Sequence, residues 1–198
     1  MKYTFTQYGQ GLLEALIAVS VVAVGVTGVM SLAGNTLTAT NVSSQELLAI
    51  NLAREGVEVI TNIRDANYLD ADTAWDTGLN SGSGNDDGII EYNTGTYTWS
   101  IDFLTANTTF ANNETIMYWD TNNLMYVQGS VEGPGWTATP YKRKIEVNRI
   151  CSENVTDFEE GTTCSGMVVG YRILSEVQWT QRENTRTVSV EKRLYNWR

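Results

Sequence analysis

The residue that first invites a chemical explanation is the single acid Glu14, at the start of a long apolar run. Between Ala15 and Gln45 the sequence contains no Asp, Glu, Lys or Arg. A lone carboxylate at the edge of such a run is costly to bury because the ionised form loses its hydration, so it usually has a functional partner. We therefore interpret Glu14 as a charge-pairing residue.

Two cysteines, Cys151 and Cys164, form a second candidate pair. The 12 residues between them, 152–163, are mostly polar or acidic. Such a pair fits one disulfide in an oxidising compartment, where closing a loop of this size stabilises the fold by about 3 kcal/mol. Two buried free thiols are the alternative, and too few Cys and His are present for a zinc site.

Catalytic chemistry finds no support in the sequence. The chain contains no His, the commonest general base and metal ligand. It also lacks the Gly-x-Ser-x-Gly nucleophile motif and a glycine-rich phosphate loop. Paired acids at 86–87 and 159–160 lie in turn-rich stretches, and the first pair lacks the spacing of a helix-loop-helix calcium site. We predict a protein that is not an enzyme and uses no cofactor or metal.

Charge is distributed unevenly along the 198 residues. The formal net charge is −10, and residues 65–141 contain 11 Asp or Glu and no Lys or Arg. Ten of the 13 basic residues lie from Lys142 onward. An acidic lobe of this kind repels nucleic acid phosphates and anionic lipid headgroups. We favour a solvated outer surface over a cation-binding or partner-steering role.

The N-terminal order of polar and apolar residues differs from that of a secretory signal. The leader, residues 1–9, is polar and carries only Lys2, and the apolar run begins after Gly9. A secretory signal has an apolar core of about 7–15 residues followed by a small-residue cleavage site, whereas about 20 apolar residues cross a bilayer. We predict a membrane-spanning segment at 10–34, with any cleavage before it.

This N-terminus resembles the prepilin signature of the type IV pilin family, which includes minor pilins and the pseudopilins of type II secretion. That signature is a short leader ending in Gly, here Gly9, then an apolar segment with a Glu at its fifth position, here Glu14. The family commonly has Phe and Thr at its first two positions, where this chain has Gln10 and Gly11. The remaining apolar positions are filled by Leu12, Leu13, Ala15, Leu16 and Ile17.

The resemblance implies a set of processing and assembly roles. A prepilin peptidase would cut between Gly9 and Gln10, making Gln10 the new N-terminus and the candidate for N-methylation. Glu14 would pair with the N-terminal amine of a neighbouring pilin subunit and so check the register of packing, since an unpaired carboxylate is unfavourable in a low-dielectric bundle. The alternative for Glu14 is a plain anchor helix with an acid at headgroup level.

Partners and location follow from the same resemblance. They are other pilin subunits, the prepilin peptidase, a membrane assembly platform, a motor ATPase and membrane lipid before assembly. The precursor would span the cytoplasmic (inner) membrane once with its domain outside the cytoplasm. After assembly it would lie in a cell-surface filament or a secretion pseudopilus.

The helix is predicted to continue through residues 35–67. No Pro interrupts residues 11–67, and Leu48, Leu52, Val59 and Ile63 form an apolar stripe of helical period. The combined helix would be roughly 80 Å long. Residues 51–65 further resemble minor pilins of the pilus-modification type and the I-type pseudopilins. The apolar run contains Gly25, Gly28 and Gly34. These glycines permit either the close approach of another helix or a local loosening of this helix, and both interpretations stay open.

The remaining residues, 68–198, are predicted to form an extracytoplasmic β-rich domain. Residues 70–95 are dense in turn formers and predict a loop. Hairpin turns are expected at 120–123 and 181–184. A long helix lying on an antiparallel sheet is an α+β fold, with Val177, Trp179, Val188 and Val190 covering the helix. Alternating patterns predict strands at 97–103, 116–119, 124–127, 142–150, 168–179 and 185–194.

The sequence thus predicts a non-catalytic structural subunit of a type IV pilus or a related filament, assembled through its N-terminal helix. The rival interpretation is a single-pass membrane anchor that is neither cleaved nor polymerised and carries an extracytoplasmic binding or adhesion domain.

Overall fold

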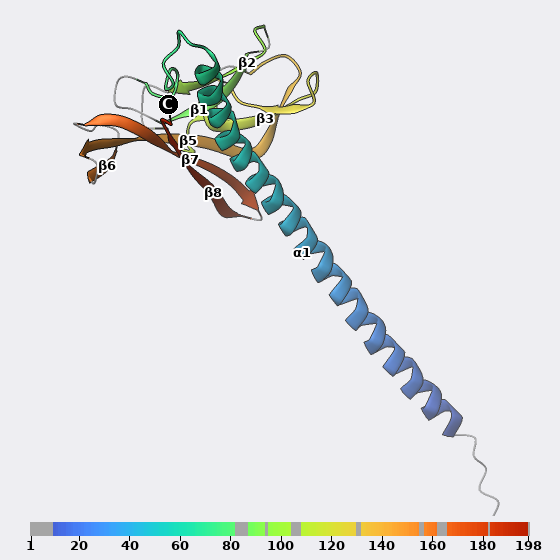
Figure 1. The fold of residues 1–198 in the computed structure, drawn as a ribbon. Helices are drawn as coiled ribbons and strands as arrows, with labels where there is room; N and C mark the ends of the chain where they lie inside the picture. Colours follow the sequence, from blue (N-terminus) through green and yellow to red (C-terminus); the bar gives the residue numbers. More distant parts are fainter. Residues whose placement is uncertain are drawn as a thin grey trace, which may run out of the picture. The chain divides into compact units, whose positions relative to one another are not determined.

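One α-helix, α1 (Gln10–Leu69), takes up 60 residues, and the strands of the β-sheet follow it along the chain (Figure 1). The chain divides into two compact units, residues 1–45 and 46–198, and α1 contributes to both. The structure is a computed structural model. It describes residues 10–81, 87–93, 95–103, 108–129, 132–154, 157–161, 166–181 and 183–197.

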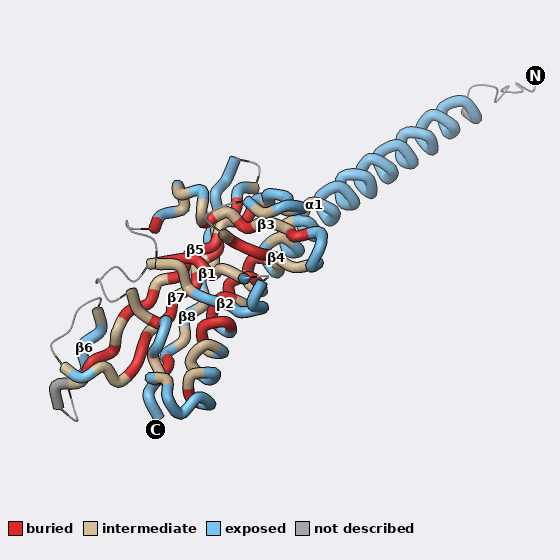
Figure 2. Tube along the Cα trace, turned by 90° about the horizontal axis from the view of Figure 1, so that it is seen from above, coloured by how far each residue is buried: buried red, intermediate tan, exposed pale blue. Residues whose placement is uncertain are grey.

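In the first unit, every residue of the helix from 11 to 37 is exposed (Figure 2). Three hydroxyls within this stretch donate to backbone carbonyls of the preceding turn: Ser20 to Leu16 at 2.7 Å, Thr27 to Ala23 and Val24, and Thr36 to Leu32. Such bonds satisfy a hydroxyl inside its own helix, so these polar residues add little polarity to an otherwise apolar surface.

In the second unit, the remaining part of α1 buries one face. Buried positions recur three or four residues apart, at the helical period, and include Leu52 and Val59 of the predicted stripe. Val57, which the sequence pattern did not select, is also buried. Fully burying a side chain of this size contributes about 1.5–3 kcal/mol relative to exposure, so this face supplies much of the driving force for helix packing.

The described strands form one eight-stranded antiparallel sheet, with a short 3-10 turn η1 (Asn113–Thr115) ahead of β3. The strands are β1 (Asp87–Asn93), β2 (Thr98–Phe103), β3 (Ile116–Asp120), β4 (Met125–Val127), β5 (Trp136–Asn154), β6 (Asp157–Gly161), β7 (Met167–Gln181) and β8 (Asn184–Tyr195).

Strand β5 organises the sheet. Along one edge it pairs with β7, from Tyr141 opposite Trp179 to Ser152 opposite Met167. Along its other edge it pairs in turn with β3, β1 and β6. Strand β8 pairs with β7, and the hairpins β1–β2 and β3–β4 extend the sheet beyond β5. A strand of 19 residues is long enough to hold three partners on one edge.

Two buried clusters lie between α1 and the sheet, where Figure 2 shows the buried residues of the helix next to those of the strands. One cluster joins Ile60 of α1 to residues of β5 and β7. The other joins Leu52 to Val177 and Trp179, with Val188 and Val190 packed against it. These clusters confirm the prediction that the last two strands cover the helix, and the predicted α+β fold is confirmed with them.

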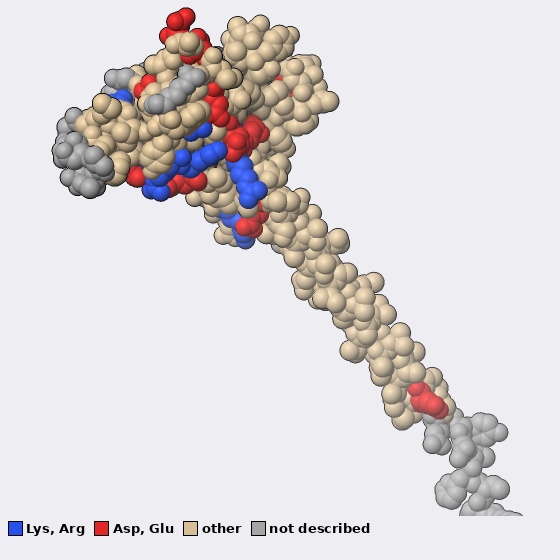
Figure 3. Space-filling view, in the orientation of Figure 1, with Lys and Arg blue, Asp and Glu red and all other residues tan. Residues whose placement is uncertain are grey.

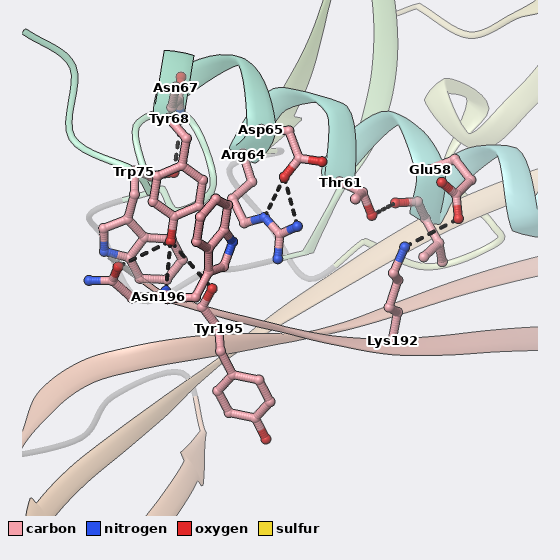
Figure 4. A network of polar contacts seen from close by, with 12 residues as sticks. Glu58, Thr61, Arg64, Asp65, Asn67, Tyr68, Trp75, Lys192, Tyr195 and Asn196 are labelled. Atoms are coloured by element: carbon pink, nitrogen blue, oxygen red, sulfur yellow. Dashed lines mark hydrogen bonds and ion pairs between the residues drawn. The ribbon is translucent and has the colours of Figure 1, made fainter. Parts of the chain in front are cut away.

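The end of α1 is tied to the end of β8 by hydrogen bonds (Figure 4). The hydroxyl of Tyr68 donates to Asn196 Oδ1 at 3.0 Å and accepts from the backbone N–H of Trp197 at 3.1 Å. Nearly three turns earlier in α1, Lys192 Nζ lies 3.2 Å from Glu58 Oε1. Contacts between residues more than 120 positions apart therefore fix this part of the helix on the sheet.

Two loop predictions were wrong. Residues 87–93, predicted as part of a loop, form β1, and residues 157–161, predicted as a polar connection that included Glu159 and Glu160, form β6. Both segments are short and bounded by turn-forming residues. Pairing of β1 with β2 and β5, and of β6 with β5, overrides that local signal. The strand predicted at 142–150 is longer at both ends, and α1 ends at Leu69.

Candidate functional site

The surface that most needs an explanation is the exposed apolar part of α1 around Glu14. Leu13, Leu16 and Ile17 keep more than half of their surface exposed, at 61, 61 and 56%. The large apolar side chains stay exposed along the helix as far as Leu37, which is 68% exposed. Contiguous apolar surface of this extent is costly in water, and it marks a site that contacts lipid or protein.

The length of this segment suits a membrane. Residues 11–34 rise about 36 Å along the axis, against a hydrocarbon core of about 30 Å. By length and composition, α1 is the one helix of the described chain that is long and apolar enough to cross a membrane, and none of its most apolar window is buried. A secretory signal sequence meets the same criteria of length and composition.

Glu14 is the only charged residue between Gln10 and Gln45, and Figure 3 shows the helix as uncharged except for one acidic group near its start. The sequence from Gln10 to Ala53 offers no Lys or Arg as a partner. A carboxylate that is to be taken out of water therefore needs a cation from outside this part of the chain.

The other predicted site residues have different surroundings. Gln10 is the first residue of α1, and Gly9 lies outside the described residues. Cys151 is buried within β5 and pairs with Val168 near the start of β7. Cys164 lies outside the described residues, so the disulfide stays a prediction.

Sequence reasoning missed a buried polar cluster that joins α1 to the sheet. Arg143 of β5 is completely buried, and its Nη1 donates to the Leu52 carbonyl at 3.1 Å and to Glu55 Oε1 at 3.3 Å. Its Nε donates to Gln128 Oε1 at 2.7 Å. Burial lowers the pKa of the Arg143 guanidinium, and the Glu55 carboxylate opposes that shift.

A signal for this cluster was present in the alternation of β5. Tyr141, Ile145 and Val147 are buried, and Arg143 shares their parity, which places it on the inner face of the sheet. A charged residue is rarely fully buried unless it is paired. The residue type of Arg143 therefore indicated a surface position, whereas the alternation of β5 indicated a buried one.

The outer face of the sheet carries ion pairs. In Figure 3 the basic groups form a band interleaved with acidic groups on the sheet. Lys144 pairs with Glu176 at 2.8 Å, and Arg172 pairs with Glu146 at 3.0 Å and Glu191 at 3.3 Å. Within the described residues, no group of three or more potential metal ligands among His, Cys, Asp and Glu comes together.

No protein-family model, curated protein or solved structure matches this chain. The architecture, with a long N-terminal apolar helix whose later part packs on an antiparallel sheet, is pilin-like.

Proposed function

We propose that this chain is a non-catalytic structural subunit of a type IV pilus or a related filament, in the manner of a minor pilin. The observation that carries the proposal is the lone carboxylate of Glu14 on an exposed apolar helix that runs on into the core of an α+β domain. A simple anchor does not require the helix to continue into the core. A filament subunit uses the first part for packing and the second for its own fold.

Assembly would proceed by exchange of one apolar environment for another. Before assembly, residues 11–34 lie in lipid. After assembly, the same side chains contact helices of neighbouring subunits, so little apolar surface meets water at either stage. Packing then depends on shape and on polar pairs more than on hydrophobicity, since lipid tails are as apolar as Leu.

Glu14 would select the register of that packing. Cleavage between Gly9 and Gln10 creates an α-amino group, the nearest available cation in a bundle of these helices. Burying one partner of a charge pair without the other costs about 3–5 kcal/mol. A subunit out of register would incur this cost, whereas one in register would not.

The proposal includes the machinery that the pilin resemblance implies. A prepilin peptidase removes residues 1–9 and is the candidate to methylate Gln10. A membrane assembly platform and a motor ATPase move the subunit from the inner membrane into a filament of pilin subunits.

Co-expression of the full chain with a prepilin peptidase tests the first step. Intact mass spectrometry should show a mature protein that begins at Gln10, while a Gly9→Val variant should keep residues 1–9. A wild-type chain that still begins at Met1 would contradict the pilin proposal and favour the uncleaved single-pass anchor.

The role of Glu14 has its own test. Glu14→Gln should be cleaved normally but enter filaments about tenfold less or worse, because it cannot neutralise the amine of its neighbour. Glu46→Gln, an exposed acid on the same helix outside the apolar run, is the matched control and should assemble like wild type. Immunoblots of sheared filaments measure incorporation. Equal incorporation of both variants would refute the pairing role.

A further inference from the structure

A pocket of about 540 Å³ lies on the outer face of the sheet, at the end where β6, β5, β7 and β8 run side by side. The pairing register places Glu160 beside Ile150, Ile150 beside Gly170, and Gly170 beside Tyr195. These four residues form one row across four strands, and three of them, Glu160, Ile150 and Tyr195, line the pocket.

Two aromatic side chains, from the outermost of these four strands, line the pocket. Phe158 of β6 is 60% exposed and Tyr195 of β8 is 46% exposed. The ring of Tyr195 lies over Gly170, since a Cβ there would be 2.8 Å from Tyr195 Cδ1. Figure 4 shows the Tyr195 side chain pointing away from α1. The ring therefore faces the outer side of the sheet, where it contributes nothing to the core beneath the helix.

The polar side of the pocket is preorganised by ion pairs. Arg193 Nε lies 3.0 Å from Glu160 Oε1, and Arg193 Nη1 lies 3.3 Å from Glu191 Oε1. Arg172 Nε lies 3.6 Å from the other oxygen of Glu160. Each charge is held in place and neutralised by its neighbours, so hydrogen-bond donors and acceptors lie next to each other without a net positive charge.

We propose that this pocket binds a neutral saccharide. The apolar faces of a sugar ring stack on aromatic side chains such as Phe158 and Tyr195. Each sugar hydroxyl both donates and accepts, which matches the adjacent carboxylate of Glu160 and guanidinium of Arg193. The volume lies within the range of small-molecule sites. A phosphate-bearing ligand fits less well, because Glu160 and Glu191 already neutralise Arg193.

Ligand-observed saturation-transfer NMR tests the site on the full chain. The protein is kept in lauryldimethylamine oxide, since a maltoside or glucoside detergent would itself compete. Glucose, galactose, N-acetylglucosamine and glucuronate are the probes. At least one neutral sugar should receive saturation, at an affinity in the millimolar range or tighter (about 4 kcal/mol of binding free energy), and glucuronate should receive no more than glucose.

Variants locate the binding. Tyr195→Ala and Phe158→Ala should each weaken saturation transfer about fivefold or more, while Tyr195→Phe, which keeps the ring, should retain it. Tyr97→Ala is the control, because Tyr97 is a more exposed aromatic (77%) in the turn before β2 and does not line the pocket. Thermal unfolding of each variant should match wild type.

Each of the following outcomes would overturn the proposal. They are absence of saturation with every neutral sugar, equal saturation in the Tyr195→Ala and Tyr97→Ala variants, and preferential binding of glucuronate. Capture of an apolar peptide at the pocket in place of any sugar would overturn it as well. The proposal stands or falls independently of cleavage and filament assembly.

Discussion

At the residue scale, Gly56 shows how closely α1 approaches the sheet. A Cβ at this position would lie 2.6 Å from Ser175 Oγ and 3.0 Å from Ile145 Cδ1. Separations this short require a shift of the helix or of the core side chains. The glycine lowers the intrinsic stability of the helix, but it permits the contact on which the core depends.

Gly56→Ala should therefore destabilise the protein by about 1–3 kcal/mol, although Ala favours a helix over Gly by about 1 kcal/mol. Gly34→Ala is the matched control, because no atom lies within 4 Å of a Cβ there. Thermal unfolding of the full chain in detergent, followed by circular dichroism, compares the two. A melting temperature for Gly56→Ala at or above that of Gly34→Ala would contradict the close-approach argument.

Asp120 controls the turn between β3 and β4. Its carboxylate accepts from Asn123 Nδ2 at 2.6 Å and from the backbone N–H groups of Asn122 and Asn123. The Asn123 side chain contributes most to a pKa of Asp120 below its usual value, and burial opposes the shift. Because the folded-state pKa is the lower one, the ionised form stabilises the fold above the unfolded pKa. That contribution is lost as the pH falls through the folded pKa.

Asp120→Asn should accordingly be less stable than wild type at pH 7, and the difference should narrow as the pH approaches about 3 or lower. Asp72→Asn, a change at an exposed acid, serves as control. Melting temperatures measured across this pH range give the comparison. A constant difference between Asp120→Asn and wild type at all pH values would show that the carboxylate charge does not support the turn.

At the element scale, β5 and α1 meet through the buried Arg143. Its guanidinium bonds to the backbone of α1 and to two side chains, while Nη2 has no partner among the described residues. A buried charge is strongly dependent on its partners, so the cluster fixes the position of α1 on the sheet more than it adds net stability.

Arg143→Ala should cost about 3–5 kcal/mol, because it leaves a cavity and removes the partner of buried Gln128. Arg143→Met, which fills the volume, should cost less. Lys144→Ala on the outer face breaks the partly exposed pair with Glu176 and should cost about 1 kcal/mol or less. Urea unfolding followed by tryptophan fluorescence measures all three. A loss for Arg143→Ala no larger than that for Lys144→Ala would contradict the assignment.

Elements with a strong local pattern were predictable from sequence. The stripe of α1 and the alternation of β7 and β8 depend on residues a few positions apart, and Leu52, Val177 and Trp179 are buried as predicted. Strand β1 depends on its pairing with β2 and β5, which no local pattern reports. The pocket on the outer face was not predicted. Strands β6 and β8 come near it only because of the order of the strands in the sheet, which no local pattern reports.

In the candidate site too, a residue with a local sequence signal was recognisable, whereas one whose burial depends on other segments was not. Glu14 was found because a single charge in an uncharged stretch is visible in sequence. Arg143 was missed because its burial depends on partners from α1 and from Gln128. The partner proposed for Glu14 belongs to another subunit, so the fold of one chain does not test it.

At the scale of the whole molecule, the two units differ in the solvent that suits them. Residues 11–37 present an uncharged surface apart from Glu14. The unit of residues 46–198 contains its own buried clusters and carries the remaining described charges, most of them on its surface. The first unit suits lipid or protein, and the second suits water.

A chain that begins at Glu46 should therefore stay monomeric in water with mixed helix and strand signals in circular dichroism, whereas the mature chain should require detergent. Size-exclusion chromatography with light scattering measures both. The prediction fails if the shortened chain aggregates as strongly as the full one, or if the full chain is monomeric without detergent.

The pairing of β5 also bears on how this domain tolerates change in length. Within the part of the chain that the structure describes, hairpin β1–β2 joins β5 through two residue pairs, Asp87 with Glu146 and Gly88 with Ile145. The register of β5 is set on its opposite edge by twelve pairs with β7. Insertions or deletions at the tip of β1–β2 therefore leave the alignment of the other strands untouched. Related chains could diverge freely at that hairpin while keeping the frame of α1, β5, β7 and β8.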